Sequence, residues 1–343
     1  MPELRHDPIQ RRWVIIARER GARPLQYEGE LRFPRHNSCP FCEGMEAVTP
    51  PEILALGPAG RQPNTPGWDL RVVPNKFPAL QIEGEPERRG VGYYDVMNGI
   101  GAHEVLIETP RHMLHMAEMS PEQMARIFFA YQARLVDLKR DPRFKYVMIF
   151  KNYGADAGAT IAHPHTQIIA TPVTPRTVAN ELMSARDHFR HKERCLFCDI
   201  LHQEMESGAR LAALTDHFAA ICPFASRFPY ELMILPRKHS WDFADERPEI
   251  VQDLATMMHL VMKRLRAALN DPPFNFVFHV APNTQHHLRR SNYWDTIQYD
   301  WHWHVEILPR MTQPAGFEWG TGLHINPVAP EVAADHLRKV QVA

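Results

Sequence analysis

Two segments of the chain place apolar side chains at every third or fourth position, one segment in each half. They cover residues 120–140 and 247–270, and each has a proline at its second position. Each segment ends directly before an Asp-Pro dipeptide, whose proline prevents a helix from continuing. This pattern predicts two long amphipathic helices at corresponding places in the two halves.

Short apolar alternations on both sides of these helices predict β-strands. The stretch before each helix closes with a proline, a basic residue and a histidine, at His112 in the first half and His239 in the second. The stretches after the helices, residues 144–152 and 274–283, are rich in aromatic and β-branched side chains. An H-x-H segment follows in each half. Because the same elements recur in the same order, we interpret the chain as a duplicated αβ unit.

Four of the five cysteines form two Cys-x-x-Cys pairs, Cys39 with Cys42 and Cys195 with Cys198. The fifth, Cys222, has apolar neighbours and is interpreted as an inert buried thiol. Two thiolates three residues apart can hold one zinc ion when histidines complete the tetrahedron. A redox-active pair would need a strand followed by a helix, whereas both pairs are expected in short turns that contain proline or phenylalanine. The pattern therefore favours zinc.

The duplication supplies the histidines that complete these sites. In an extended strand, residues i and i+2 point to the same face, so one histidine of each H-x-H segment can bind metal while the other faces the same space. Four protein ligands close a tetrahedral site, which is typical of structural rather than catalytic zinc. We therefore expect two Zn²⁺ ions per chain, held by Cys39, Cys42, His112 and His163 and by Cys195, Cys198, His239 and His302.

The composition argues against several classes of function. The 39 basic and 40 acidic side chains give a net charge of −1, which creates no global field for nucleic acid or an anionic membrane. Apolar runs stay shorter than the ~18 residues of a membrane span, and the N-terminus lacks the apolar stretch of a signal peptide. We expect a cytoplasmic protein that binds small molecules, with no nucleic acid and no membrane among its partners.

The segment His163-Pro164-His165-Thr166-Gln167 resembles the active-site signature of the galactose-1-phosphate uridylyltransferases, a nucleotidyl-transferring branch of the histidine-triad superfamily. The resemblance covers nearly the whole chain, with further matches in RRWVIIARERGARP, RVVPNKFPAL and FKNYGADAGATIAHPHTQ. It implies an α+β fold in which duplicated histidine-triad-like units form an extended antiparallel sheet with helices packed on one face. The expected halves are 1–175, which carries HPHTQ, and 176–343, which carries the second metal site. A homodimer is also implied.

The resemblance further implies that His165 is the nucleophile, attacking the α-phosphorus of a UDP-sugar to form a covalent intermediate. Gln167 lies two residues further along the same strand face and can donate to a phosphate oxygen in the transition state. The expected substrate-binding positions are Arg20, Arg23, Asn75, Asn152, Thr160 and Gln167. The two arginines can neutralise a diphosphate, or can belong to a solvated surface.

This makes the first hypothesis a UDP-glucose–hexose-1-phosphate uridylyltransferase of galactose metabolism, in which UMP passes from UDP-glucose to galactose 1-phosphate by a ping-pong route. Two positions depart from the pattern. Lys76 replaces an aspartate of the family's uridine loop, and Thr321-Gly322 replaces a Tyr-Glu dipeptide, as in a plant relative that acts as an ADP-glucose phosphorylase. Pro164 instead favours the uridylyltransferases.

Two alternatives to this hypothesis stay open. One is an adenylyltransferase or phosphorylase that acts on ADP-glucose with the same nucleophile. The other is a zinc-stabilised nucleotide-binding module without catalysis, against which the intact His165 and Gln167 argue.

The second metal site also has an alternative. Family members without the second cysteine pair bind iron through a glutamate, a histidine and an H-x-H segment, and the matching residues here are Glu181, His279, His302 and His304. His302 cannot easily serve both ligand sets. Two thiolates favour zinc, so the cysteine-containing set is preferred.

Overall fold

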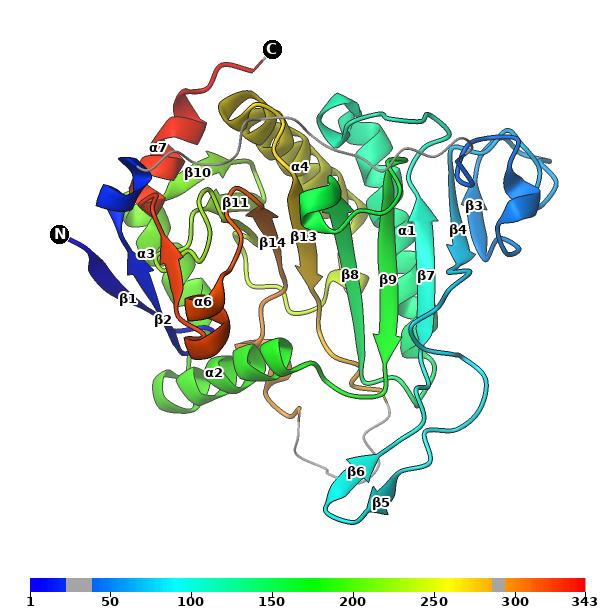
Figure 1. Cartoon of the computed structure of the whole chain (residues 1–343), viewed down its shortest axis with the longest axis horizontal. Coiled ribbons are helices and arrows are strands. Elements are labelled where there is room, and N and C mark those ends of the chain that lie inside the picture. Colours follow the sequence, from blue (N-terminus) through cyan, green and yellow to red (C-terminus); the bar gives the residue numbers. More distant parts are fainter. Residues whose placement is uncertain (23–38, 286–293, 343) are drawn as a thin grey trace.

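A ten-stranded antiparallel sheet runs through the protein (Figure 1). The computed structural model describes residues 1–22, 39–285 and 294–342. Five strands come from the first half: β3 (Leu54–Leu56), β4 (Leu70–Pro74), β7 (Ala102–Ile107), β8 (Tyr146–Tyr153) and β9 (His165–Thr171). Five come from the second: β10 (Leu211–Leu214), β11 (Phe218–Ile221), β12 (Leu232–Pro236), β13 (Phe274–His279) and β14 (His304–Pro309).

The two halves contribute their strands in the same order, counted outward from the centre. One half reads β8-β9-β7-β4-β3 and the other β13-β14-β12-β11-β10. The halves meet where β8 and β13 pair antiparallel, with Asn152 opposite Asn275. This arrangement confirms the duplicated αβ unit and the extended antiparallel sheet. The boundary at residue 175 stays a prediction, and it falls directly before α2 (Arg176–Lys192).

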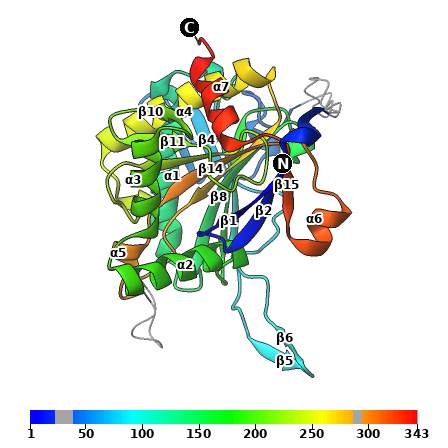
Figure 2. The same cartoon turned by 90° about the vertical axis from the view of Figure 1, so that its left-hand side faces the viewer.

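The two predicted long helices are α1 (Pro121–Lys139) and α4 (Pro248–Leu269), and they pack together on one face of the sheet (Figure 2). Ser120 caps α1, because its hydroxyl accepts from the Gln123 N–H while the Gln123 side chain accepts from the Ser120 N–H. Phe128 of α1 packs edge-on against Phe278 of β13, so a helix of the first half covers a strand of the second. The expectation of helices on one face is confirmed.

The opposite face is partly covered by a three-stranded sheet made of β1 (Glu3–Asp7), β2 (Arg12–Ile16) and β15 (His324–Asn326). A hairpin of β5 (Arg89–Val91) and β6 (Tyr94–Val96) projects from the body (Figure 2). The remaining helices are α3 (Leu196–Ser207), α5 (Ile297–Asp300), α6 (Gly316–Thr321) and α7 (Pro330–Lys339). Short 3₁₀ turns lie at η1 (Arg18–Ala22), η2 (Glu46–Val48), η3 (Met116–Glu118), η4 (Ala155–Ala157) and η5 (Phe243–Asp245). Within the described ranges, every helix is too short or too polar to cross a membrane.

Two local expectations were wrong. The H-x-H strands β9 and β14 begin only at the second histidine, so His163 and His302 precede the strands instead of sharing a strand face with their neighbours. The second cysteine pair does not lie in a simple turn either. Cys195 is the residue before α3, and Cys198 lies in the first turn of that helix.

Candidate functional site

The first predicted ligand set comes together in the structure. The ligand atoms of Cys39, Cys42, His112 and His163 all lie within 4.8 Å of one another. The Cys42 Sγ is 3.4 Å from His112 Nδ1 and 3.7 Å from His163 Nδ1. Tetrahedral zinc with its usual bond lengths sets sulfur and nitrogen about 3.6 Å apart, so these four side chains fit a zinc ion.

The second predicted set repeats this geometry in the other half. Cys195, Cys198, His239 and His302 also have their ligand atoms within 4.8 Å. The Cys198 Sγ is 3.4 Å from His239 Nδ1 and 3.5 Å from His302 Nδ1. The two sets also match in burial. His163 and His302 are buried, whereas His112 and His239 are exposed. Two matching groups of soft ligands fit two zinc ions better than iron.

The hydrogen bonds and protonation states of these side chains suit the binding of a cation. His163 Nε2 donates to the Thr109 carbonyl over 2.7 Å, which leaves Nδ1 without a proton and facing the cysteines. Burial lowers the pKa of His163 to about 4, which keeps the ring neutral. Burial and the adjacent Cys39 raise the pKa of Cys42 to about 11, while a hydrogen bond from Cys195 lowers the pKa of Cys198 to about 3. Each pair thus resists holding two thiolates until a cation neutralises them.

His165 uses the opposite ring nitrogen from His163. Its Nδ1 donates to the His163 carbonyl over 2.7 Å, so Nε2 keeps its lone pair. The side chain is buried, and its ring lies 5.3 Å from the Phe41 ring, beside the first cysteine pair. Burial, with a further contribution from the charge of Lys151, lowers the pKa of His165. A neutral imidazole with a fixed tautomer and a free Nε2 is suited to act as a nucleophile.

A buried ion pair supports the strand behind His165. The Lys151 ammonium contacts both oxygens of Glu108 at 2.7 Å and donates to the His165 carbonyl over 3.1 Å. The Glu108 carboxylate also accepts from the hydroxyl of Thr166, which in turn lies 2.7 Å from the Tyr131 hydroxyl. Burial lowers the pKa of Lys151, and the Glu108 carboxylate opposes this effect. The pair therefore ties β9, which begins at His165, to β7 and β8.

Replacing Lys151 with methionine leaves the Glu108 carboxylate buried without its counter-charge. Such a loss costs about 3–5 kcal/mol, so we expect the free energy of unfolding in urea to fall by that amount at neutral pH. In the double variant Lys151→Met, Glu108→Gln the unpaired charge is gone, and most of the stability should return. An equal loss in the single and double variants would contradict an ion pair that matters for folding.

The remaining predicted substrate residues gather only in part. Continuing the β8–β9 register by two residues beyond Phe150 and Gln167 sets Asn152 across from His165. Asn75 lies at the end of β4, where its Nδ2 is 3.0 Å from His103 Nε2. Thr160 is an exposed residue on the loop that leads to the H-x-H segment, and Arg20 is exposed in η1. Arg23 lies outside the described residues.

The alternative iron ligands form a different group from the expected one. Glu181, His279 and His304 do come together, but Glu306 takes the fourth place, because His302 lies with the cysteines. Burial alone would lower the pKa of His279, yet Glu181 and Glu306 raise it to about 10. All four side chains are buried. His302 therefore belongs to the cysteine set alone, and the two ligand sets do not share a residue.

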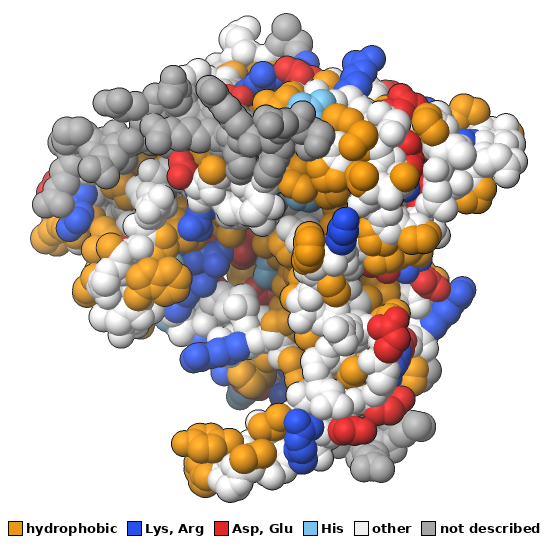
Figure 3. Space-filling view, turned by 45° about the vertical axis from the view of Figure 1, so that its right-hand side comes forward, with side chains coloured by type: hydrophobic (Ala, Val, Ile, Leu, Met, Phe, Trp, Pro, Cys, Tyr) orange, Lys and Arg blue, Asp and Glu red, His pale blue; other side chains and the backbone are white. Residues whose placement is uncertain are grey.

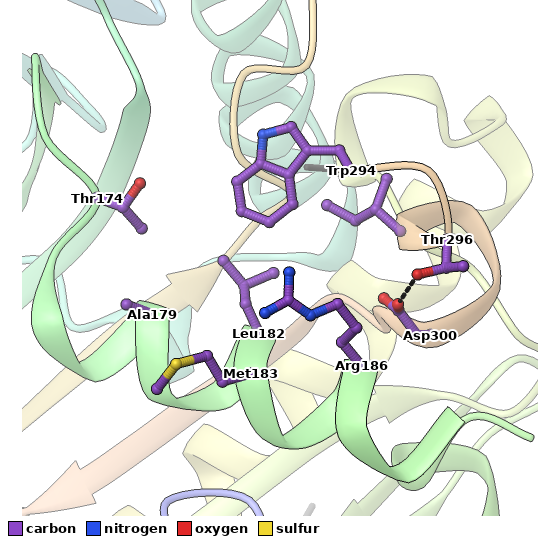
Figure 4. Close-up of a pocket in the computed structure, with 9 residues that line it drawn as sticks. Thr174, Ala179, Leu182, Met183, Arg186, Trp294, Thr296 and Asp300 are labelled. Atoms are coloured by element: carbon purple, nitrogen blue, oxygen red, sulfur yellow. Dashed lines mark hydrogen bonds between the residues drawn. The ribbon is translucent and has the colours of Figure 1, made fainter. Parts of the chain in front are cut away.

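A small cavity lies apart from His165, between α2 and α5 (Figure 4). Its volume is about 50 Å³, below the roughly 300 Å³ of a small-molecule pocket. The Thr296 hydroxyl donates to the Asp300 carboxylate over 2.6 Å, and the Asp300 carbonyl accepts from the Cys195 thiol. The cavity therefore borders the second cysteine pair. A hollow is visible on the face drawn in Figure 3, where Lys and Arg side chains gather along one side.

Several residues of the site were missed by the sequence reasoning. The missed residues contact the predicted ones, and they are His103 on β7, Glu108 directly after β7, Lys151 on β8, Asn275 on β13 and Glu306 on β14. Only the strand register brings them together, and the sequence did not specify it. A duplicated pattern could have pointed to Glu306, since it occupies the position that Gln167 holds in the first half.

Known protein families match this chain along its whole length. The model for the N-terminal domain of galactose-1-phosphate uridyl transferase matches residues 1–175, and a model described as a domain of unknown function matches residues 101–341. A protein of Arabidopsis thaliana named ADP-glucose phosphorylase is 34% identical over 346 residues, covering 99% of this chain and 93% of its own. The galactose-1-phosphate uridylyltransferase of Thermotoga maritima is 29% identical over 350 residues, covering 100% and 99%.

Solved structures agree with these sequence matches. The crystal structure of the Arabidopsis thaliana ADP-glucose phosphorylase with bound ADP-glucose has a TM-score of 0.84 at 33% identity, and 100% of both chains is covered. A uridylyltransferase structure has a TM-score of 0.74 at 24% identity, and the match covers 98% of this chain and 97% of that one. This similarity supports the fold. The chain therefore belongs to the galactose-1-phosphate uridyl transferase family.

Proposed function

We propose that this chain transfers the nucleoside monophosphate of a nucleotide sugar through a covalent intermediate on His165. The observation that carries the proposal is the tautomer of this residue, whose Nδ1–H is held by the His163 carbonyl while Nε2 keeps its lone pair. Burial keeps the ring in its neutral, nucleophilic form by lowering its pKa. Gln167 lies two residues further along β9 and can donate to a phosphate oxygen.

The proposed reaction has two displacements at the same phosphorus. His165 Nε2 attacks the α-phosphorus, the bond to the bridging oxygen breaks, and the sugar phosphate leaves with the electron pair. An oxygen of the acceptor phosphate then attacks the same phosphorus, and the phosphorus–nitrogen bond breaks to restore the imidazole. The amide N–H groups of Gln167 and Asn152 would stabilise the charge that builds on the phosphate oxygens.

Zinc in the two Cys₂His₂ groups is part of this proposal. Closed tetrahedral sites supply structure and no open coordination position for substrate. An ion bound by the His163 ring would also hold the His163 carbonyl in place, since ring and carbonyl belong to the same residue, and this carbonyl orients His165. Zinc held by the first group would therefore fix His165 before substrate arrives, and zinc held by the second group would stabilise the corresponding region of the other half.

The first candidate donor is UDP-glucose, with galactose 1-phosphate as acceptor. It is supported by the HPHTQ segment, in which Pro164 matches the uridylyltransferases, and by similarity to the Thermotoga maritima protein.

The second candidate is ADP-glucose with phosphate as acceptor, and a backbone feature favours it. Gly322 ends α6 with a φ of 72°, in the left-handed region where a glutamate is strained. The family's Tyr-Glu dipeptide would put a glutamate at this position, whereas this chain has Thr321-Gly322. The relative at 34% identity carries the name ADP-glucose phosphorylase.

Intact-protein mass spectrometry after incubation with each donor, in the absence of acceptor, tests the function and separates the candidates. A UMP adduct from UDP-glucose supports uridylyl transfer, and an AMP adduct from ADP-glucose supports adenylyl transfer. Adding galactose 1-phosphate or inorganic phosphate should then remove the adduct. Absence of an adduct with both donors would contradict covalent transfer.

A further inference from the structure

The carboxamides of Gln167 and Asn152 can each lie in two orientations. A carboxamide has an acceptor oxygen at one end and two donor hydrogens at the other, and the two ends have nearly the same shape. Only hydrogen-bond partners decide which end faces a neighbouring phosphate. If the oxygen faced the phosphate, it would repel the negative charge instead of stabilising it.

His103 on β7 fixes the orientation of Gln167. The Ala79 N–H donates to His103 Nδ1 over 3.1 Å, so the neutral ring carries its proton on Nε2. That Nε2 lies 2.9 Å from Gln167 Oε1 and also 3.0 Å from Asn75 Nδ2, but an amide nitrogen does not accept. The His103 proton therefore goes to the Gln167 oxygen, and the Gln167 NH₂ group points elsewhere.

Asn275 on β13 fixes the orientation of the Asn152 carboxamide. Its Nδ2 donates to Asn152 Oδ1 and to the Ala157 carbonyl, both over 2.8 Å. Both hydrogens of the Asn275 amide are thereby used, and the Asn152 oxygen is occupied. Asn275 is directly opposite Asn152 in the register, and Ala157 belongs to the η4 turn that follows β8. A strand of the second half thus orients a side chain of the first.

We propose that His103 and Asn275 are positioning residues that turn the amide N–H groups of Gln167 and Asn152 toward the transferred phosphate. This inference rests on the proposed function, because it needs a phosphate at His165. It also means that the second half, which lacks HPHTQ, contributes a positioning residue, Asn275, to the site of the first half. His103 further connects the loop that carries Asn75 and Ala79, which resembles the family's uridine loop, to Gln167, since it contacts all three residues.

Double-variant cycles on the single-turnover rate of adduct formation test this inference. His103→Met should slow the step roughly 10-fold, less than the 10²–10³-fold loss that removing a donor such as Gln167 can cause. In a Gln167→Ala background, His103→Met should change the rate less than about twofold, because His103 acts through Gln167. Asn275→Leu should behave in the same way with Asn152→Ala.

A conservative variant and a binding measurement separate positioning from general structure. His103→Gln carries an N–H donor of similar reach and should restore most of the rate that His103→Met loses. Calorimetric affinity for the nucleotide sugar should change less than the rate does. Additive effects in both cycles, or no rescue by His103→Gln, would overturn the inference while wild-type adduct formation still stands. A wild-type chain that forms no adduct would instead overturn the proposed function.

Discussion

Replacing His165 with alanine is expected to lower turnover of the nucleotide sugar by at least about 10³-fold, because the side chain forms the covalent bond of the proposed reaction. The rest of the site should survive. His163 keeps its contact with the Thr109 carbonyl, and the Lys151–Glu108 pair lies on the other side of the strand. Steady-state turnover with UDP-glucose and with ADP-glucose measures the effect, and thermal unfolding checks that the variant is folded.

His202→Ala is a matched control for the loss of one imidazole. This residue is exposed on α3 of the second half, whereas His165 begins β9 of the first. We expect its turnover to equal that of the wild type. If His165→Ala kept turnover within about tenfold of the wild type, the side chain would not be the nucleophile.

Removing one thiolate from either cysteine pair is expected to release one zinc ion and to destabilise the fold. Binding of structural zinc contributes on the order of 10 kcal/mol in small zinc domains, so losing a ligand should lower the melting temperature by more than about 5 °C. Cys42→Ser and Cys198→Ser are matched variants, since they occupy corresponding places in the two halves. Metal content by elemental analysis and thermal unfolding measure the two effects.

The two cysteine variants should differ in their chemistry. The carbonyl of His163 orients His165, so loss of the first ion should also slow adduct formation. Loss of the second ion should affect stability more than the rate, because its ligands lie in the other half. Fewer than two tightly bound zinc ions in the wild-type chain, or iron in place of one of them, would contradict the assignment.

The sequence was most informative where chemistry limits geometry. Zinc accepts a narrow range of ligand distances, so two Cys-x-x-Cys pairs and four repeated histidines predicted two groups of four side chains, and the structure brings both groups together. The long helices followed from their apolar spacing and from the proline at each start. The repeat of both patterns indicated two similar halves, and the family resemblance implied that their strands form one sheet.

Contacts between distant strands could not be predicted in the same way. Asn275 and Asn152 are 123 residues apart, and only the pairing of β8 with β13 brings their amides together. Glu306 lies with Glu181, His279 and His304 because it is two residues beyond His304 on β14, whereas the sequence reasoning stopped at the H-x-H segment. The homodimer implied by the family resemblance stays a prediction.

The proposed covalent intermediate on His165 is tested by locating the transferred nucleotide on the chain. The protein is incubated with a nucleotide sugar labelled in its α-phosphate, kept at alkaline pH to protect a phosphorus–nitrogen bond, digested and mapped by tandem mass spectrometry. We expect a single nucleotidyl group on the peptide that contains His163-Pro164-His165, attached to His165. A nucleotidyl group on any other residue, or turnover of the sugar without any labelled peptide, would contradict it.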